Sequence, residues 1–173
     1  VVLLTACGDQ ETSYNLADIT GKIPDLKFRL NGATGETRTA ADVQGRAVLM
    51  YFGYTHCPDV CPMTLGRVKT ALAKLPDDLA EQTAVVFVAV DPARDTPERV
   101  RSYLANFHFP NAVGLIGQGD GFQRLKERYH VYVKLQKDGP GDSDYEVTHP
   151  SQVYVFGPQG KARVLARMSG KQP

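Results

Sequence analysis

The sequence lacks most of the features that would indicate a nucleic-acid-binding, membrane-spanning or hydrolytic protein. Its 20 basic and 19 acidic side chains leave a formal net charge of +1, and no basic cluster stands out, which argues against nucleic acid as a partner. No internal repeat is visible, and no hydrophobic stretch approaches the ~18 residues of a membrane-spanning helix. Neither a pair of catalytic carboxylates nor a Ser/His/Asp order is present. Tryptophan is absent, and the chain has three cysteines. The cysteines are therefore the first candidates for functional residues.

With 42% hydrophobic residues, the chain has room for one ordinary core, and we expect a single domain. Apolar runs alternate with segments whose apolar residues recur at helical spacing. Residues 84–90 are continuously apolar, as a strand buried on both faces should be. The pattern predicts an α/β fold with a mixed central sheet flanked by helices. The predicted strands are residues 26–30 and 36–39 (an N-terminal β-hairpin), 47–52, 84–90, 131–135, 152–156 and 163–166, and helices are predicted from Pro62, from about Asp95 and over residues 119–129.

Two cysteines, Cys57 and Cys61, have three residues between them and directly follow the apolar run of residues 47–52. That run predicts a buried strand that delivers both thiols to its C-terminal end, where ligands bind in α/β sheets. Each cysteine precedes a proline, which disfavours the α conformation, so we predict Pro62 as the first helical residue, with Cys61 at or beside the N-cap. At the positive end of a helix, both pKa values should fall below the ~8.5 of a free cysteine, which favours metal ligation or nucleophilic attack.

The first residues resemble the end of a bacterial lipoprotein signal peptide. Residues 4–7 match a lipobox, in which a small-residue cleavage site precedes a cysteine that becomes lipidated. We therefore expect residues 1–7 to be a signal remnant with Cys7 as the lipidation site, residues 8–21 to be a flexible tether and residues 22–173 to form the globular domain. The alternative is a short apolar stub with an isolated cysteine. An acylated Cys7 would anchor the protein in the bacterial cell envelope, with its domain in the periplasm or otherwise outside the cytoplasm.

Three separated motifs resemble those of the Sco (SenC) family of copper chaperones. They are residues 51–62 around the cysteines, the run Val-Asp-Pro-Ala-Arg-Asp-Thr-Pro at residues 90–97, and Val-Thr-His at residues 147–149 before a strand. The resemblance covers roughly residues 20–168. It implies a thioredoxin-like fold and one copper ion bound by Cys57, Cys61 and His149. It also implies a role in assembling the dinuclear copper centre of cytochrome c oxidase.

The donor chemistry agrees with that resemblance. Cu(I) is a soft ion that accepts two thiolates and an imidazole, whereas structural zinc usually takes four protein ligands, and this chain cannot easily supply a fourth. The same residues can hold Cu(II), or the sulfurs can leave as a disulfide and release the metal. The partners implied are the copper-bearing subunit of cytochrome c oxidase, another copper donor protein, a thiol reductase, and the membrane through the lipid anchor.

Within a thioredoxin-like sheet, the turn that carries His149 faces the cysteine loop. The next residue, Pro150, stands where thioredoxins carry a cis-proline, and departs from the serine or threonine associated with the Sco family, so both isomers are considered. A thioredoxin-like fold would also add a helix after the last predicted strand, so we expect the domain to lack its C-terminal helix at Pro173.

Several further residues have candidate functional or structural roles. Asp91 ends the second buried strand at the same sheet edge, where it would hydrogen-bond a ligand, steer a partner or simply form a turn before proline. Asp59, between the thiols, is a docking candidate. Asp95 is predicted to cap a helix and Arg94 to be a solvated or turn-anchoring base. His56 is either a spare ligand or a packing or surface residue.

Other uses of the thiol pair are a structural disulfide, which in so small a ring contributes only about 2 kcal/mol, and enzymatic chemistry. A thiol–disulfide oxidoreductase of the envelope would use Cys57 as the nucleophile and Cys61 to resolve the mixed disulfide, without metal. Such reductases usually present Cys-x-x-Cys. A peroxiredoxin-type peroxidase would need Thr-x-x-Cys, but Thr55 lies only two residues before Cys57. We therefore predict a copper chaperone rather than an enzyme, with reduction of the target's cysteines as an accompanying step.

Overall fold

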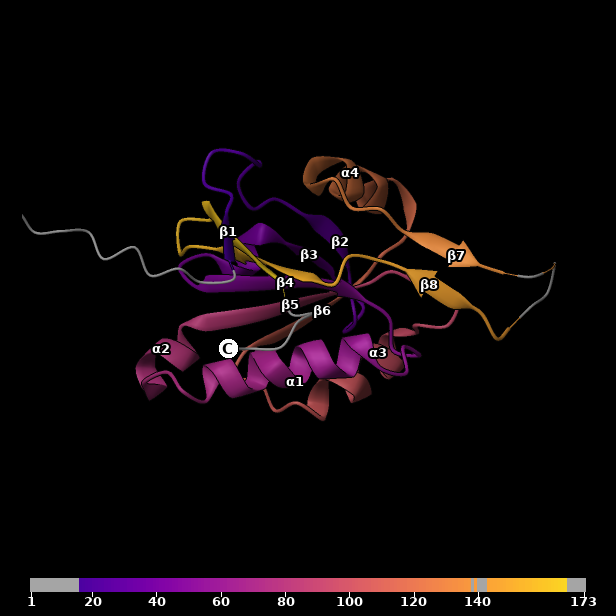
Figure 1. Cartoon of the computed structure of the whole chain (residues 1–173), viewed down its shortest axis with the longest axis horizontal. Coiled ribbons are helices and arrows are strands. Elements are labelled where there is room, and N and C mark those ends of the chain that lie inside the picture. Colours follow the sequence, from indigo (N-terminus) through magenta and orange to yellow (C-terminus); the bar gives the residue numbers. More distant parts are fainter. Residues whose placement is uncertain (1–15, 138, 140–142, 168–173) are drawn as a thin grey trace, which may run out of the picture.

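An eight-stranded mixed sheet runs through the molecule in the order β1-β10-β9-β4-β5-β6-β2-β3 (Figure 1). The structure is a computed structural model that describes residues 16–137, 139 and 143–167. The pairs β4–β5 and β5–β6 are parallel and the other pairs in this sheet are antiparallel. The strands of this sheet are β1 (Leu16–Asp18), β2 (Arg29–Gly32), β3 (Thr37–Thr39), β4 (Ala47–Gly53), β5 (Thr83–Ala89), β6 (Ala112–Ile116), β9 (Gln152–Phe156) and β10 (Ala162–Arg167).

The centre of the sheet is the part that the apolar runs predicted. Every residue of β5 is buried, as expected for a parallel strand covered on both faces. The predicted strands 47–52, 152–156 and 163–166 are confirmed as β4, β9 and β10, and the hairpin is confirmed as β2 and β3. Because β2 also pairs with β6, the hairpin forms one edge of the main sheet. β6, a five-residue strand that pairs in parallel with β5, was not predicted from the sequence.

Helices cover both faces of this sheet. In Figure 1, α1 (Val60–Leu72), α2 (Asp77–Glu81) and α3 (Pro97–Ala105) lie on one side and α4 (Gly119–Tyr129) lies on the other. The prediction for α4 is confirmed, and its three inner residues Phe122, Leu125 and Tyr129 are buried. The predicted mixed sheet flanked by helices is therefore confirmed. A 3₁₀ turn, η1 (Ala40–Val43), follows β3.

A second, two-stranded sheet stands apart from the main one and carries the segment that leads to His149. Its strands are β7 (Lys134–Gln136) and β8 (Glu146–Thr148), which pair antiparallel and project from one end of the molecule (Figure 1). The predicted strand 131–135 is therefore shifted toward the C-terminus. We call β7 and β8 together the histidine hairpin.

The two ends of the chain bear on the predicted tether and lipid anchor. Cys7 and the predicted signal remnant lie outside the described residues, as do residues 168–173, where a C-terminal helix would begin. Within the predicted tether of residues 8–21, Leu16–Asp18 forms β1 and pairs with β10. Among the described residues, no helix combines the length and the apolar character needed to cross a membrane.

Candidate metal centre

The two cysteines lie where β4 leaves the middle of the sheet. β4 ends at Gly53, and the loop of residues 54–59, here called the cysteine loop, connects it to α1. Cys57 is half-buried in this loop, whereas Cys61 lies in the first turn of α1 and its side chain is fully buried. The backbone N–H of Cys61 donates to Sγ of Cys57, at 3.3 Å. The two sulfurs therefore meet at the positive end of α1, but only one of them faces outward.

The helix begins at Val60, two residues earlier than predicted, with Asp59 as its N-cap residue. Cys61 is helical although the residue before a proline prefers extended backbone. Pro62 has no N–H that would need a partner there, and the N–H of Cys61 finds one in the Cys57 sulfur. Cys61 is consequently a helical residue and not a cap.

His149 comes to the same point from the end of the histidine hairpin. Its Nε2 lies 3.3 Å from Sγ of Cys61, and its Nδ1 lies 2.9 Å from the carbonyl oxygen of Pro150. A carbonyl can only accept, so Nδ1 carries a proton and Nε2 is the ring nitrogen that faces the Cys61 sulfur. The ligand atoms of Cys57, Cys61 and His149 all lie within 4.8 Å of one another. None of the described peptide bonds is cis, which answers the question left open for Pro150.

Two tyrosines that the sequence analysis did not single out hold the imidazole between them. The rings of Tyr51 and Tyr54 pack edge-to-face against the His149 ring, with centroids 6.0 and 5.5 Å away. Both tyrosines are buried. Tyr51 belongs to β4 and Tyr54 is the first residue after that strand, so the strand that delivers the cysteines also builds the wall behind the histidine. Their place beside the cysteine motif was the only signal in the sequence.

The two thiols have opposite acidities. A hydrogen bond from the Cys61 thiol lowers the pKa of Cys57 to about 4, against the effect of burial, and the backbone N–H groups of Cys61 and Asp59 act in the same direction. Donating that bond, together with burial, raises the pKa of Cys61. The prediction that both thiols would be acidic is confirmed for Cys57 and wrong for Cys61, because one proton shared between two close sulfurs favours the thiolate on the better-solvated one.

An open cleft of about 320 Å³ leads to this group. One side is lined by Tyr54 and residues 57–60, and the other by β8, His149 and Ser151. The exposed Asp59 lies on its rim as well as being the N-cap residue of α1. The half-buried Cys57 therefore lines an open cleft, whose lining also includes the exposed acidic residues Asp59 and Glu146 on its two sides.

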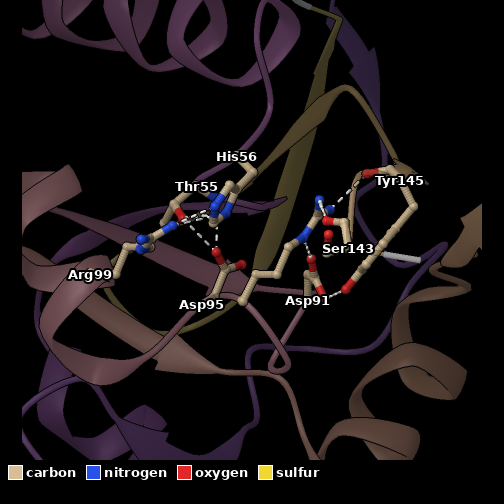
Figure 2. A network of polar contacts seen from close by, with 8 residues as sticks. Thr55, His56, Asp91, Asp95, Arg99, Ser143 and Tyr145 are labelled. Carbon is tan, nitrogen blue, oxygen red and sulfur yellow. Dashed lines mark hydrogen bonds and ion pairs between the residues drawn. The ribbon is translucent and has the colours of Figure 1, made fainter. Parts of the chain in front are cut away.

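The structure places the other singled-out residues near this centre but not in it. Asp91 is fully buried and bonds to Arg94 and Tyr145 (Figure 2). The expectation that Asp95 caps α3 is wrong, because Thr96 is the cap residue and accepts from the N–H of Arg99. Asp95 turns inward instead, toward Thr55.

His56 and Arg94 lie outside the group of candidate metal ligands. His56 is exposed, and its ring contacts the guanidinium of Arg99, so it lies outside the donor group. Arg94 anchors a turn, as one reading of the sequence allowed, and its side chain is only 14% exposed. Neither residue adds a fourth donor to the two sulfurs and the imidazole.

A donor set of two sulfurs and one imidazole suits a soft ion of low coordination number such as Cu(I). Among the described residues, no fourth histidine, cysteine or carboxylate joins the group, as a closed structural zinc site would need. The fold and this group together define a thioredoxin-like protein with a dithiol–imidazole centre at the carboxyl end of its central strands.

Comparison with known proteins places the chain in a family. The chain belongs to the SCO1/SenC family, whose model matches residues 18–172. The mitochondrial protein SCO2 of Saccharomyces cerevisiae is 34% identical over 134 residues, which cover 78% of this chain and 44% of that protein. The matched part is thus less than half of that curated relative.

Solved structures agree with this assignment and with the predicted fold. The chain superimposes on ScoI of Bradyrhizobium japonicum with copper bound at a TM-score of 0.72 and 31% identity, covering 85% of this chain and 91% of that one. For Arabidopsis thaliana ScoI with copper bound, the TM-score is 0.75 at 31% identity, with 85% and 89% coverage. The thioredoxin-like fold with a mixed sheet is therefore confirmed.

Proposed function

We propose that this protein binds one Cu(I) ion through Cys57, Cys61 and His149 and delivers copper to the dinuclear copper centre of cytochrome c oxidase. The observation that carries the proposal is the convergence of three soft or borderline donors, from a loop, a helix and a separate hairpin, within 4.8 Å of one another. The similarity to two ScoI proteins with copper bound supports it. The ion is cargo, so the site must both accept and release it.

The charges and protons of the site suit reversible binding. At neutral pH Cys57 is already a thiolate, because its pKa is about 4, and Nε2 of His149 faces the sulfurs while Nδ1 contacts the carbonyl oxygen of Pro150. Cys61 keeps its proton until metal arrives, so binding releases a proton and competes with it. Formation of a Cys57–Cys61 disulfide removes both sulfur donors, which couples release of the ion to oxidation. The same set can hold Cu(II) after the ion is oxidised.

The partners that we infer follow from this cargo. They are the copper-bearing subunit of cytochrome c oxidase, an upstream copper donor and a thiol reductase that returns the cysteines to the reduced form. Asp59 on the cleft rim is our candidate for docking. We further infer an envelope protein that is lipid-anchored through Cys7, with its globular domain outside the cytoplasm.

One observation favours a second function, thiol–disulfide exchange without metal. An acidic, accessible Cys57 beside a protonated Cys61 is the arrangement of a nucleophile and a resolving thiol. The Cys57 thiolate would attack a partner disulfide and expel one partner thiolate. Cys61 would then lose its proton, attack Sγ of Cys57 and expel the second, which leaves the partner reduced and this protein oxidised by two electrons. His149 has no bond-making role in that exchange.

Metal analysis of the reduced protein after Cu(I) loading tests the first function. We expect one copper per chain, lost in both Cys57→Ser and Cys61→Ser. Cys7→Ser is the matched control, because Cys7 lies outside the described residues and is not a proposed ligand, so this variant should keep the full copper content. Copper retained by either of the first two variants would contradict the proposed ligand set.

A further inference from the structure

The turn between β5 and α3, residues 91–95, lies beside both segments that carry the metal-ligand candidates (Figure 2). Its carboxylates Asp91 and Asp95 are the buried acidic side chains of the described residues, at 0% and 1% exposure. Burying a carboxylate is costly unless it is paired or hydrogen-bonded, so each demands partners. Tyr145 and Thr55, one from each ligand-bearing segment, supply partners, and Arg94 of the turn itself supplies another, while Oδ2 of Asp95 has no hydrogen-bond partner among the described residues.

On one side, the turn holds the start of the histidine hairpin's second strand. Oδ1 of Asp91 accepts a hydrogen bond from the Tyr145 hydroxyl at 2.6 Å, and Oδ2 accepts from Nε of Arg94 at 2.5 Å. Arg94 also donates to the carbonyl oxygen of Tyr145 at 2.8 Å, and its guanidinium lies 3.6 Å from the centre of the Tyr145 ring. Asp91 and Arg94 thus contact Tyr145 through its hydroxyl, its ring and its backbone carbonyl.

These contacts to Tyr145 matter because the histidine hairpin is not part of the main sheet. Its strands pair with each other in a separate two-stranded sheet, and an isolated hairpin is only marginally stable in water. Tyr145, Val147 and His149 alternate along an extended segment and therefore share one face. A slip of one residue would turn His149 away from the sulfurs. Fixing Tyr145 fixes which way His149 points.

On the other side, the same turn holds the start of the cysteine loop. Oδ1 of Asp95 accepts from the N–H of Thr55 at 3.0 Å and from its hydroxyl at 2.6 Å, two residues before Cys57. The two carboxylates are themselves fixed relative to each other, because the N–H of Asp95 donates to the carbonyl oxygen of Asp91 at 2.8 Å. The cysteine loop and the turn also start side by side, since the N–H of Val90 donates to the carbonyl oxygen of Gly53.

We propose that the turn of residues 91–95 is a shared positioning element of the copper site. Asp91 and Arg94 position His149 through Tyr145, and Asp95 positions Cys57 through Thr55. Asp91, Arg94 and Asp95 lie outside the donor group of Cys57, Cys61 and His149. The inference rests on the proposed copper binding and adds the residues that set the site's geometry, since groups that orient metal ligands typically change metal affinity 10–100-fold.

A double-mutant cycle tests the histidine side. Tyr145→Phe removes the hydroxyl bond to Asp91 but keeps the ring, so we expect Cu(I) affinity, measured by competition with a chromogenic chelator, to fall about tenfold. In a His149→Ala background the same substitution should cause no further loss, because Tyr145 acts through His149. The matched control is Tyr132→Phe, whose ring is 62% exposed, and which should leave affinity unchanged. A full additional loss in the His149→Ala background would overturn the histidine half of the proposal.

The cysteine side predicts the opposite dependence on His149. Thr55→Val removes the hydroxyl bond to Asp95 and should also weaken Cu(I) binding about tenfold, but this loss should persist in the His149→Ala background. Thr55→Ser keeps the hydroxyl and should bind as the unaltered protein does. Equal affinity in Thr55→Val and Thr55→Ser would overturn the cysteine half.

A measurement on the metal-free, reduced protein separates this inference from the proposed function. By amide hydrogen exchange, Tyr145→Phe should speed exchange in residues 145–149 about tenfold without changing residues 55–61, and Thr55→Val should do the reverse. If the unaltered protein fails to bind Cu(I), the proposed function falls while this exchange pattern still decides whether the turn holds both segments. Unchanged exchange in both variants overturns the positioning role.

Discussion

The cysteine loop and the histidine hairpin supply donors to one centre, yet they are built in opposite ways. The cysteine loop lies between β4, which has a neighbouring strand on each side, and α1, whose first turn buries Cys61 completely. The histidine hairpin is a two-stranded sheet outside the main one, with Leu135 39% exposed. One pair of donors is thus part of the core, and the third is delivered by a peripheral segment.

This difference separates two properties of the site. We expect the sulfurs to keep their mutual geometry and most of their difference in acidity without the hairpin, because the hydrogen bond from the Cys61 thiol is the largest cause of the lowered Cys57 pKa. Under the proposed function, the imidazole is the ligand that is delivered by a separate segment. Thiol reactivity should therefore depend on the core that holds the cysteines, and metal retention should depend on the histidine hairpin.

The largest expected contrast is between the two thiols themselves. At pH 6, Cys57 with a pKa of about 4 is thiolate, whereas burial and the raised pKa keep Cys61 protonated. Alkylation by iodoacetamide, followed by mass spectrometry of the peptides, should modify Cys57 on the order of 100 times faster than Cys61. The rate at Cys57 should stay flat from pH 8 down to about 5 and fall near pH 4, because protonation of the thiolate begins there. In urea both thiols should react alike, and equal rates in the native protein would argue against the asymmetry.

The next contrast sets the hairpin against the loop. His149→Ala removes one of the proposed donors and should weaken Cu(I) binding at least tenfold in a competition titration. The alkylation rate of Cys57 at pH 6 should change by no more than about threefold, since the Cys61 thiol and the backbone N–H groups of Cys61 and Asp59 lower the pKa of Cys57 more than His149 does. Unchanged Cu(I) affinity would remove His149 from the site. A collapse of Cys57 reactivity would instead show that the loop depends on the hairpin.

A smaller effect probes how tightly the core holds the sulfurs. In Gly53→Ala the new Cβ would lie 2.9 Å from both the Phe87 and Tyr51 rings and 3.1 Å from Sγ of Cys61. Such crowding should cost about 1–3 kcal/mol in the free energy of unfolding, measured by urea denaturation.

The matched control for that substitution is Gly66→Ala in α1. No atom lies within 4 Å of the added Cβ there, and a helical alanine should stabilise the protein by about 0.5–1 kcal/mol. If the two glycine variants were equally stable, the packing around Cys61 would be looser than the distances indicate.

What could be predicted from the sequence follows the same division. Long apolar runs and helical periodicity located β4, β5, β9 and α4, and the spacing of Cys57 and Cys61 located the thiols. β6 was missed because five residues with a central glycine carry little periodic signal, and its place depends on pairing with β5. Local patterns were sufficient to predict the elements whose structure is determined by burial in the core.

The remaining features depend on interactions between residues that are far apart in the sequence. His149 could be named only through a family resemblance, since it lies 88 residues from Cys61 in the chain. Asp95 was misread as a helix cap because its sequence context fits a cap, while its real partner, Thr55, lies 40 residues away. The acidity of Cys61 was misjudged because the helix-dipole argument considers each thiol alone and ignores the proton that the two share.

The unequal exposure of the sulfurs sets an order of events for any ion held between them. Cys61 is sealed from solvent at 0% exposure, so a partner's thiolate cannot approach it directly, whereas Cys57 and His149 line the open cleft. Under the proposed function, an acceptor would therefore displace His149 or Cys57 first and Cys61 last. Hand-over of the ion would then be a stepwise exchange that enters from the cleft.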